Sequence, residues 1–147
     1  MSKILLKGNQ LNKNYGRVKA VTNLSFEIRK GSVYGILGPN GSGKSTTLGI
    51  VLNVVNASSG NFEWFEGTLS TQDALKKVGA IIERPNFYPY MSARENLELV
   101  GLIKEIPNSA VPKVLKEVGL ADRSEDLFST FSLGMKQRLA IASALLN

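Results

Sequence analysis

The sequence contains no cysteine and no histidine. Without cysteine the chain has no disulfide scaffold, no thiolate metal site and no cysteine nucleophile. Without histidine it lacks the commonest general base and the commonest zinc ligand. These two absences exclude cysteine- and histidine-dependent chemistry from the functions to be considered.

Long hydrophobic runs are also missing. No apolar stretch approaches the roughly 18 residues that cross a bilayer as a helix. The apolar stretch within residues 1–7 is too short for a signal peptide, so we expect a cytoplasmic protein. With 43% hydrophobic and 20% charged residues, the 147 residues have the composition of one folded domain rather than a disordered chain.

The positive charge is unevenly distributed. The chain has 18 basic and 12 acidic residues, a net charge of +6. Residues 1–30 carry the whole surplus, because Glu27 is the single acid among their basic residues: Lys3, Lys7, Lys13, Arg17, Lys19, Arg29 and Lys30. These basic residues alternate with apolar ones, which indicates a solvated strand face. We therefore do not expect nucleic acid as a partner.

Hydrophobic spacing predicts that the first half of the chain is rich in strands. Residues 4–37 have the pattern of strands and turns, and residues 61–65 that of a further strand. Two short apolar runs, 33–37 and 79–83, have the composition of strands that are buried on both faces. The second half is predicted to be helical.

Start and stop signals define the helices. Ser92 and Glu95 form a capping box, and an amphipathic face follows as far as Ile103. Pro112 is tolerated in the first turns of a further helix, which Gly119 is expected to end. We expect helices over 45–53, 71–78, 93–103, 109–118 and from Ser132 to the last residue.

A glycine-rich segment follows the first buried-strand candidate: Gly38-Pro39-Asn40-Gly41-Ser42-Gly43-Lys44-Ser45-Thr46. It fits the pattern G-x-x-x-x-G-K-[ST] in full, and it lies between an expected strand and an expected helix, as this motif requires. Successive backbone N–H groups of such a loop converge on phosphates. Gly41 and Gly43 let the backbone approach them. A chance glycine-rich turn is the alternative, and a full match in that context makes it rare.

Each polar residue of the loop has an expected role. The helix that starts near Ser45 adds the positive end of its dipole. Lys44 supplies a point charge for the β- and γ-phosphates, and Ser45 supplies a hydroxyl ligand for Mg²⁺. The segment therefore predicts binding of a magnesium nucleotide.

From about Leu6 to its end the sequence resembles the ATPases of ATP-binding cassette (ABC) transporters, which implies ATP as the nucleotide. Tyr15, within Asn14-Tyr15-Gly16, stands where this family has an aromatic residue that stacks on adenine. Without the resemblance, a tyrosine at this point of a strand is more simply a packing residue.

The segment Phe131–Arg138 corresponds to the signature of that family, usually Leu-Ser-Gly-Gly-Gln followed by a basic run. Leu133 replaces the first glycine and Met135 the glutamine, whereas Ser132 and Gly134 are retained. Ser132 is expected to cap a helix whose first N–H groups form a second anion site. The resemblance implies that this site contacts the γ-phosphate held by a second ATPase subunit in a head-to-tail dimer. An ordinary capped helix is the alternative.

Glu83 ends the second buried-strand candidate, where the family normally has a glutamine that binds Mg²⁺ and the attacking water. A carboxylate can do the same, although it adds a negative charge beside the phosphates. This substitution and the Ser-Leu-Gly-Met signature resemble the ATPase subunits of bacitracin- and lantibiotic-type exporters. The alternative is a small phosphate-loop kinase in which Glu83 is a metal carboxylate.

The resemblance implies an α/β fold, that of a P-loop NTPase with an N-terminal antiparallel β-subdomain and a helical subdomain. Residues 1–83 are expected to form part of the nucleotide-binding core and residues 84–138 the helical subdomain. Residues 139–147 continue the last helix, and the chain ends before the strand that carries the family's metal-binding aspartate and water-activating glutamate. The implied catalytic residues are Lys44, Glu83, Ser132 and Gly134.

The implied partners are ATP with Mg²⁺, a second ATPase subunit and separate membrane-spanning permease subunits, which dock around 87–95 in the family. This implies a peripheral position on the cytoplasmic face of the membrane. The usual water-positioning groups are absent, so we expect the chain alone to bind ATP but hydrolyse it poorly. A non-catalytic nucleotide-binding module is a further alternative. We also expect an exposed sheet edge that lowers stability or promotes association.

Overall fold

A computed structural model describes residues 3–82 and 86–146 of the chain. The chain divides after Ala74 into two units, each with its own cluster of buried apolar residues. The division falls within the short helix α2 (Thr71–Lys76), and the boundary after residue 83 stays a prediction. Among the helices in the described ranges, none is both long and apolar enough to cross a membrane.

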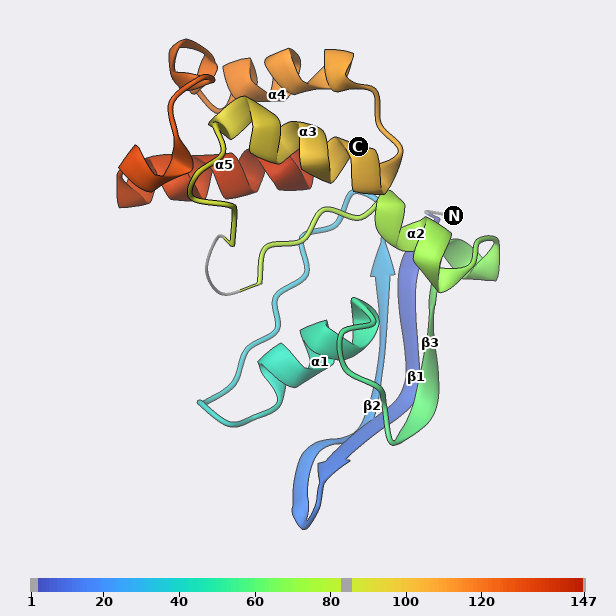
Figure 1. Ribbon diagram of the computed structural model, residues 1–147. Coiled ribbons are helices and arrows are strands. Elements are labelled where there is room, and N and C mark those ends of the chain that lie inside the picture. The colour runs from blue at the N-terminus through green and yellow to red at the C-terminus, as the bar shows by residue number, and fades with distance from the viewer. Residues whose placement is uncertain (1–2, 83–85, 147) are drawn as a thin grey trace. The chain divides into compact units, whose positions relative to one another are not determined.

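Three strands form the sheet of the first unit. They are β1 (Ile4–Tyr15), β2 (Val18–Arg29) and β3 (Ser59–Trp64), arranged antiparallel in the order β2-β1-β3 (Figure 1). A tight turn at Gly16, where φ is 58°, joins the first two strands. The strands expected within residues 4–37 and 61–65 are confirmed up to Arg29 and Trp64.

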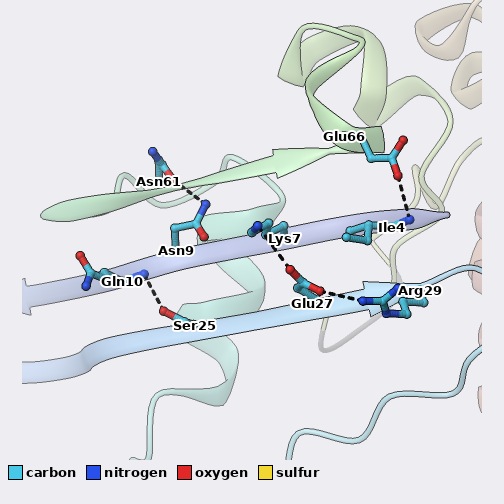
Figure 2. Close-up of polar contacts among 9 residues, drawn as sticks. All are labelled: Ile4, Lys7, Asn9, Gln10, Ser25, Glu27, Arg29, Asn61 and Glu66. Atoms are coloured by element: carbon cyan, nitrogen blue, oxygen red, sulfur yellow. Dashed lines mark hydrogen bonds and ion pairs between the residues drawn. The ribbon is translucent and has the colours of Figure 1, made fainter. Parts of the chain in front are cut away.

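Polar side chains connect the strands on the surface of this sheet (Figure 2). The carboxylate of Glu27 lies 3.3 Å from Lys7 and 3.1 Å from Arg29. Asn9 donates to Asn61 across the β1–β3 pair at 3.1 Å. Most of the basic residues of the N-terminal segment are exposed, which confirms a solvated face: Lys3, Arg17, Lys19, Arg29 and Lys30.

The helix α1 (Lys44–Val51) belongs to the same unit. Its Ile50 is fully buried in one cluster with Leu11 of β1 and Val21 of β2. At the next residue, the indole N–H of Trp64 donates to the carbonyl of Val51 at 2.9 Å. The apolar contacts and this hydrogen bond hold the C-terminal end of α1, the helix that begins with the phosphate-loop lysine, against the sheet.

The second unit is a cluster of three helices, α3 (Ala93–Lys104), α4 (Val111–Glu117) and α5 (Leu133–Leu145), which pack against one another (Figure 1). Its core holds one leucine or valine from nearly every turn, fully or almost fully buried: Leu97, Val111, Leu115, Leu120, Leu139 and Leu146. Short 3-10 turns connect the helices at 108–110, 121–123 and 128–130, and another follows β3 at 65–67.

The expected capping box at the start of α3 is confirmed. The Ser92 hydroxyl accepts from the N–H of Glu95 at 3.1 Å, and the Glu95 carboxylate accepts from the N–H of Ser92 at 2.7 Å. Two N–H groups that the helix leaves without a partner are thereby satisfied.

The two buried-strand predictions are wrong in the described residues. Neither 33–37 nor 79–82 is a strand, and the side chains of Val33 and Leu37 are almost fully exposed. A strand exists only where its backbone pairs with a neighbour, and the sheet described here consists of β2, β1 and β3 alone. Gly79 packs instead so closely against the C-terminal end of α5 that a Cβ would collide with the carbonyl of Ala144.

Candidate phosphate-binding site

The glycine-rich segment leads directly into α1. Gly43 is the N-cap residue of the helix, with φ 86° and ψ 8°, and Gly41 has φ 83°. Residues with a Cβ rarely adopt this left-handed backbone conformation, whereas glycine does so readily. The backbone here therefore requires the glycines that the motif supplies.

A close approach between two segments adds a second requirement at Gly43. A Cβ at this position would lie 2.1 Å from the carbonyl oxygen of Ala20, on β2, and 3.2 Å from a methyl group of Val21. The loop thus lies directly against the sheet, which fixes its position as well as its shape. Ala20 is a site residue that the sequence pattern did not indicate.

The ammonium group of Lys44 is held inside the loop. It donates to the carbonyl of Gly38 at 2.8 Å and to that of Pro39 at 2.7 Å. An ammonium group has three N–H donors, so one is left for a ligand. The N–H of Ser42 closes the turn by donating to Pro39 at 3.2 Å. The positive charge is therefore oriented by the same loop that would receive an anion.

A cavity of about 230 Å³ lies between this loop and β2. Its lining combines the loop, the first turn of α1 and one strand residue: Ala20, Asn40, Gly41, Gly43, Lys44, Ser45 and Thr46. The N-terminal end of a helix carries a partial positive charge and N–H groups without intrahelical partners. With the Lys44 ammonium beside them, the cavity has the donors and the charge that an anionic group requires.

The site offers one candidate ligand for a metal in its described part. Ser45 is an exposed residue in the first turn of α1. In the described ranges, no group of three or more acidic residues could hold a metal. A single hydroxyl beside a phosphate site fits Mg²⁺, because this ion keeps several waters and binds through a few protein oxygens and phosphates. Glu83, the second expected ligand, lies outside the described residues.

Tyr15 is at the end of β1, opposite Val18. Half of its side-chain surface is exposed, and the Lys13 ammonium lies 4.9 Å from the centre of its ring. The ring is therefore not a core packing residue. The sequence analysis did not identify Lys13 as a site residue, although residues two apart in a strand share one face of the sheet.

The expected signature residues belong to the second unit. Ser132 caps α5, and its hydroxyl accepts from the N–H of Met135 at 3.3 Å. Gly134 is exposed, and a Cβ there would meet no described atom within 4 Å. The Arg138 guanidinium donates to the carbonyl of Gly119 at 3.0 Å, so it closes the C-terminal end of α4. The phosphate loop and the signature residues thus lie in different units.

The aromatic stretch before α3 is held by one buried amide. Asn96, of which 2% is exposed, accepts from the N–H of Tyr88 and donates to the carbonyl oxygens of Tyr88, Met91 and Ser92. The rings of Tyr88 and Tyr90 lie 5.7 Å apart and are both exposed. Asn96 was not singled out in the sequence, because nothing local distinguishes it from a solvent-facing asparagine.

Comparison with known proteins gives several similar ones. The bacitracin transport ATP-binding protein BcrA of Bacillus licheniformis is 40% identical over 97% of this chain and 48% of its own length. The lantibiotic transport ATP-binding protein SrtF of Streptococcus pyogenes is also 40% identical, over 97% of this chain and 62% of its own length. The chain thus spans between about half and two thirds of these relatives. The expected resemblance to bacitracin- and lantibiotic-type proteins is confirmed.

Solved structures share the fold. An ATP-binding subunit of an ABC transporter superposes with a TM-score of 0.86 at 25% identity, over 97% of this chain and 62% of the other. CbiO1 of Clostridium perfringens, described as part of the ABC transporter complex CbiONQ, gives a TM-score of 0.82 at 24% identity, over 98% and 62%. These likenesses confirm the expected α/β fold. The family model for ABC transporters matches residues 21–147, so the chain belongs to the ABC transporter family.

Proposed function

We propose that the chain is the ATP-binding part of an ABC transporter ATPase, which couples ATP binding and hydrolysis to export through separate membrane subunits. The phosphate loop carries this proposal. Three kinds of donor meet at its cavity: a lysine ammonium, backbone N–H groups at the start of α1, and the Ser45 hydroxyl. This combination matches a polyphosphate better than a single carboxylate, because it spreads several donors over one concave surface.

The residues of the loop divide the work of holding MgATP. The backbone of 38–43 receives the phosphates, and Lys44 contributes the charge that reaches the β- and γ-phosphates. Ser45 holds Mg²⁺, which supplies Lewis-acid stabilisation of phosphate charge when bound. Thr46 lines the same cavity. From the sequence, Glu83 is assigned to Mg²⁺ and the attacking water.

Tyr15 is assigned the binding of the adenine base of ATP. The aromatic ring is half exposed at the end of β1, and Ala20, which lines the phosphate cavity, is on β2 two residues beyond the partner of Tyr15 in the hairpin. Stacking on a flat ring suits adenine, since every base has a π-face.

The proposed partner of the signature residues Ser132 and Gly134 is a second ATPase subunit. The Ser132 hydroxyl accepts from the N–H of Met135 at the start of α5, and the first N–H groups of a helix have no partners within the helix. The surroundings of Gly134 are open, so a phosphate can approach its backbone. We propose that this surface completes the ATP site of a second copy in a head-to-tail dimer. Two ATP molecules would then lie between the two subunits.

The aromatic stretch that Asn96 holds is the proposed contact surface for the membrane partner. Tyr88 and Tyr90 expose their rings side by side, and aromatic residues are enriched at the centres of protein interfaces. We propose that a permease subunit contacts this surface. The protein would then act at the cytoplasmic face of the membrane.

For the 147-residue chain by itself we propose ATP binding without efficient turnover. Besides the residue at the position of Glu83, hydrolysis in the family uses an aspartate that binds Mg²⁺ and a glutamate that activates the attacking water, both at the end of a strand. The chain has three aspartates, Asp73, Asp122 and Asp126. None of them follows a strand, and Asp126 is paired with Arg123 at 2.9 Å.

The experiment is a titration of ATP into the purified chain, with and without Mg²⁺, for the wild type and Ser45→Ala. We expect Mg²⁺ to strengthen ATP binding by the wild type. In Ser45→Ala, most of this effect of Mg²⁺ should be lost. A phosphate-release assay on the same samples should give little turnover. Mg²⁺-dependent binding that survives the serine substitution contradicts the assignment of Ser45, and no ATP binding at all contradicts the function.

A further inference from the structure

We propose that Lys13 is a positioning residue for nucleotide recognition: it holds one face of the Tyr15 ring and leaves the opposite face for the base. This inference rests on the proposed function, in which Tyr15 stacks on adenine. Its own support is the arrangement around the Lys13 ammonium, which contacts two separate parts of the first unit.

The first contact is with the ring. The ammonium lies 4.9 Å from the centre of Tyr15, within the distance at which a cation is attracted by the negative face of an aromatic ring. Tyr15 is half exposed, so the ring is not held by core packing. Lys13 thus covers one face of a ring that is otherwise accessible.

The second contact anchors the lysine. Its ammonium donates to the carbonyl of Asn56 at 2.7 Å, in the segment between α1 and β3. That segment is itself tied to β1 on both sides of Lys13. The N–H of Ser58 donates to Asn12 at 2.8 Å, and the Ser58 hydroxyl accepts from the N–H of Asn14 at 3.0 Å. Lys13 is therefore held by the fold, and its ammonium can act as a fixed support for the ring.

The consequence for binding is preorganisation. A half-exposed tyrosine samples several rotamers, and a ligand that stacks on it must order the side chain. An ammonium fixed on one face restricts this freedom before the nucleotide arrives. The benefit applies only to ligands with a base, because Lys13 acts through the ring. The affinity for tripolyphosphate, which has no base, should therefore not depend on Lys13.

The test compares Lys13→Met with the wild type in titrations of MgATP and of magnesium tripolyphosphate. A cation–π contact at an exposed site corresponds to about a two- to fivefold change in affinity. We expect Lys13→Met to weaken ATP by about that factor and to leave tripolyphosphate unchanged. Lys13→Arg, which keeps a cation, should restore most of the ATP affinity.

Two further variants separate this role from a general loss of charge. Lys19→Met removes the same charge from the same hairpin. Lys19 is in register with Asn14 and not with Tyr15, and successive residues of a strand point to opposite faces of the sheet, so this variant should not change the ratio of ATP to tripolyphosphate affinity. In a Tyr15→Ala background, Lys13→Met should have no further effect on ATP.

The inference is overturned if Lys13→Met leaves ATP affinity unchanged, or weakens ATP equally with and without Tyr15. It is also overturned if tripolyphosphate weakens by the same factor as ATP. These outcomes differ from failure of the proposed function, in which the wild type binds neither ligand.

Discussion

The side chain of Asn96 satisfies both backbone groups of Tyr88: its oxygen accepts from the Tyr88 N–H at 2.9 Å, and its amide donates to the Tyr88 carbonyl at 3.1 Å. The same amide also reaches the carbonyl oxygens of Met91 and Ser92. One buried side chain on α3 therefore takes the place of the regular hydrogen bonds that this irregular stretch lacks.

Replacing this amide is expected to destabilise the second unit. Asn96→Leu fills a similar volume but leaves the N–H and the carbonyl of Tyr88 without partners, which costs about 2–3 kcal/mol. Denaturant unfolding followed by circular dichroism, which is dominated by the helices, measures this loss. Asn108→Leu, at an exposed position, is the matched control and should change the free energy of unfolding by less than about 0.5 kcal/mol. Equal effects would contradict the structural role of Asn96.

Two alanine substitutions in the phosphate loop should differ in cost. Gly41 and Gly43 have nearly the same positive φ, so alanine is strained at both by about 1–2 kcal/mol. Only at Gly43 would the new Cβ also collide with the carbonyl of Ala20. We expect Gly43→Ala to lower the stability of the first unit clearly more than Gly41→Ala, as measured by the fluorescence of Trp64, the chain's single tryptophan. A smaller or equal loss at Gly43 would show that the loop does not lie against β2.

The ion pair between Arg94 and Glu125 predicts a dependence of stability on pH. The guanidinium donates to the carboxylate at 2.5 Å, and this hydrogen bond lowers the pKa of Glu125 in the folded protein. A lowered carboxylate pKa contributes stability above the pKa of the unfolded chain, and that contribution disappears as the pH falls through the folded value. The pair is exposed, so its effect is small and screened by salt.

Thermal unfolding of the wild type and Glu125→Gln from neutral to acid pH measures this contribution. The wild type should have the higher melting temperature near neutral pH, and the difference should vanish in acid, below the usual range of a glutamate pKa. Because other groups titrate equally in both proteins, the difference isolates Glu125. A difference that does not change with pH would contradict the lowered pKa.

Sequence signals were sufficient wherever the structure depends on neighbouring residues. The capping box of Ser92 and Glu95 and the N-cap at Ser132 follow from residues three positions apart. The loop that ends in Lys44 follows from its glycines. In each case the hydrogen-bond partners lie in the same stretch of the chain, so the residue types alone indicate the geometry.

The sequence was insufficient where distant segments decide the outcome. Val33 and Ile36 have the composition of a buried strand, but a strand needs a partner, and the stretch is exposed in the structure. The contact of Gly43 with Ala20 and the network of Asn96 likewise join segments that only folding brings together. Such long-range contacts leave no local signal in the sequence.

We expect ATP to bind at the phosphate loop through Lys44. Calorimetric titration of MgATP into the wild type, Lys44→Ala and Lys30→Ala tests it most directly, because Lys30 is an exposed lysine of the same unit. Trp64 fluorescence verifies that each variant is folded. Loss of a hydrogen bond to a charged group predicts ATP affinity about 10- to 150-fold weaker for Lys44→Ala, with Lys30→Ala close to the wild type. A folded Lys44→Ala protein that binds ATP as tightly as the wild type would contradict the account.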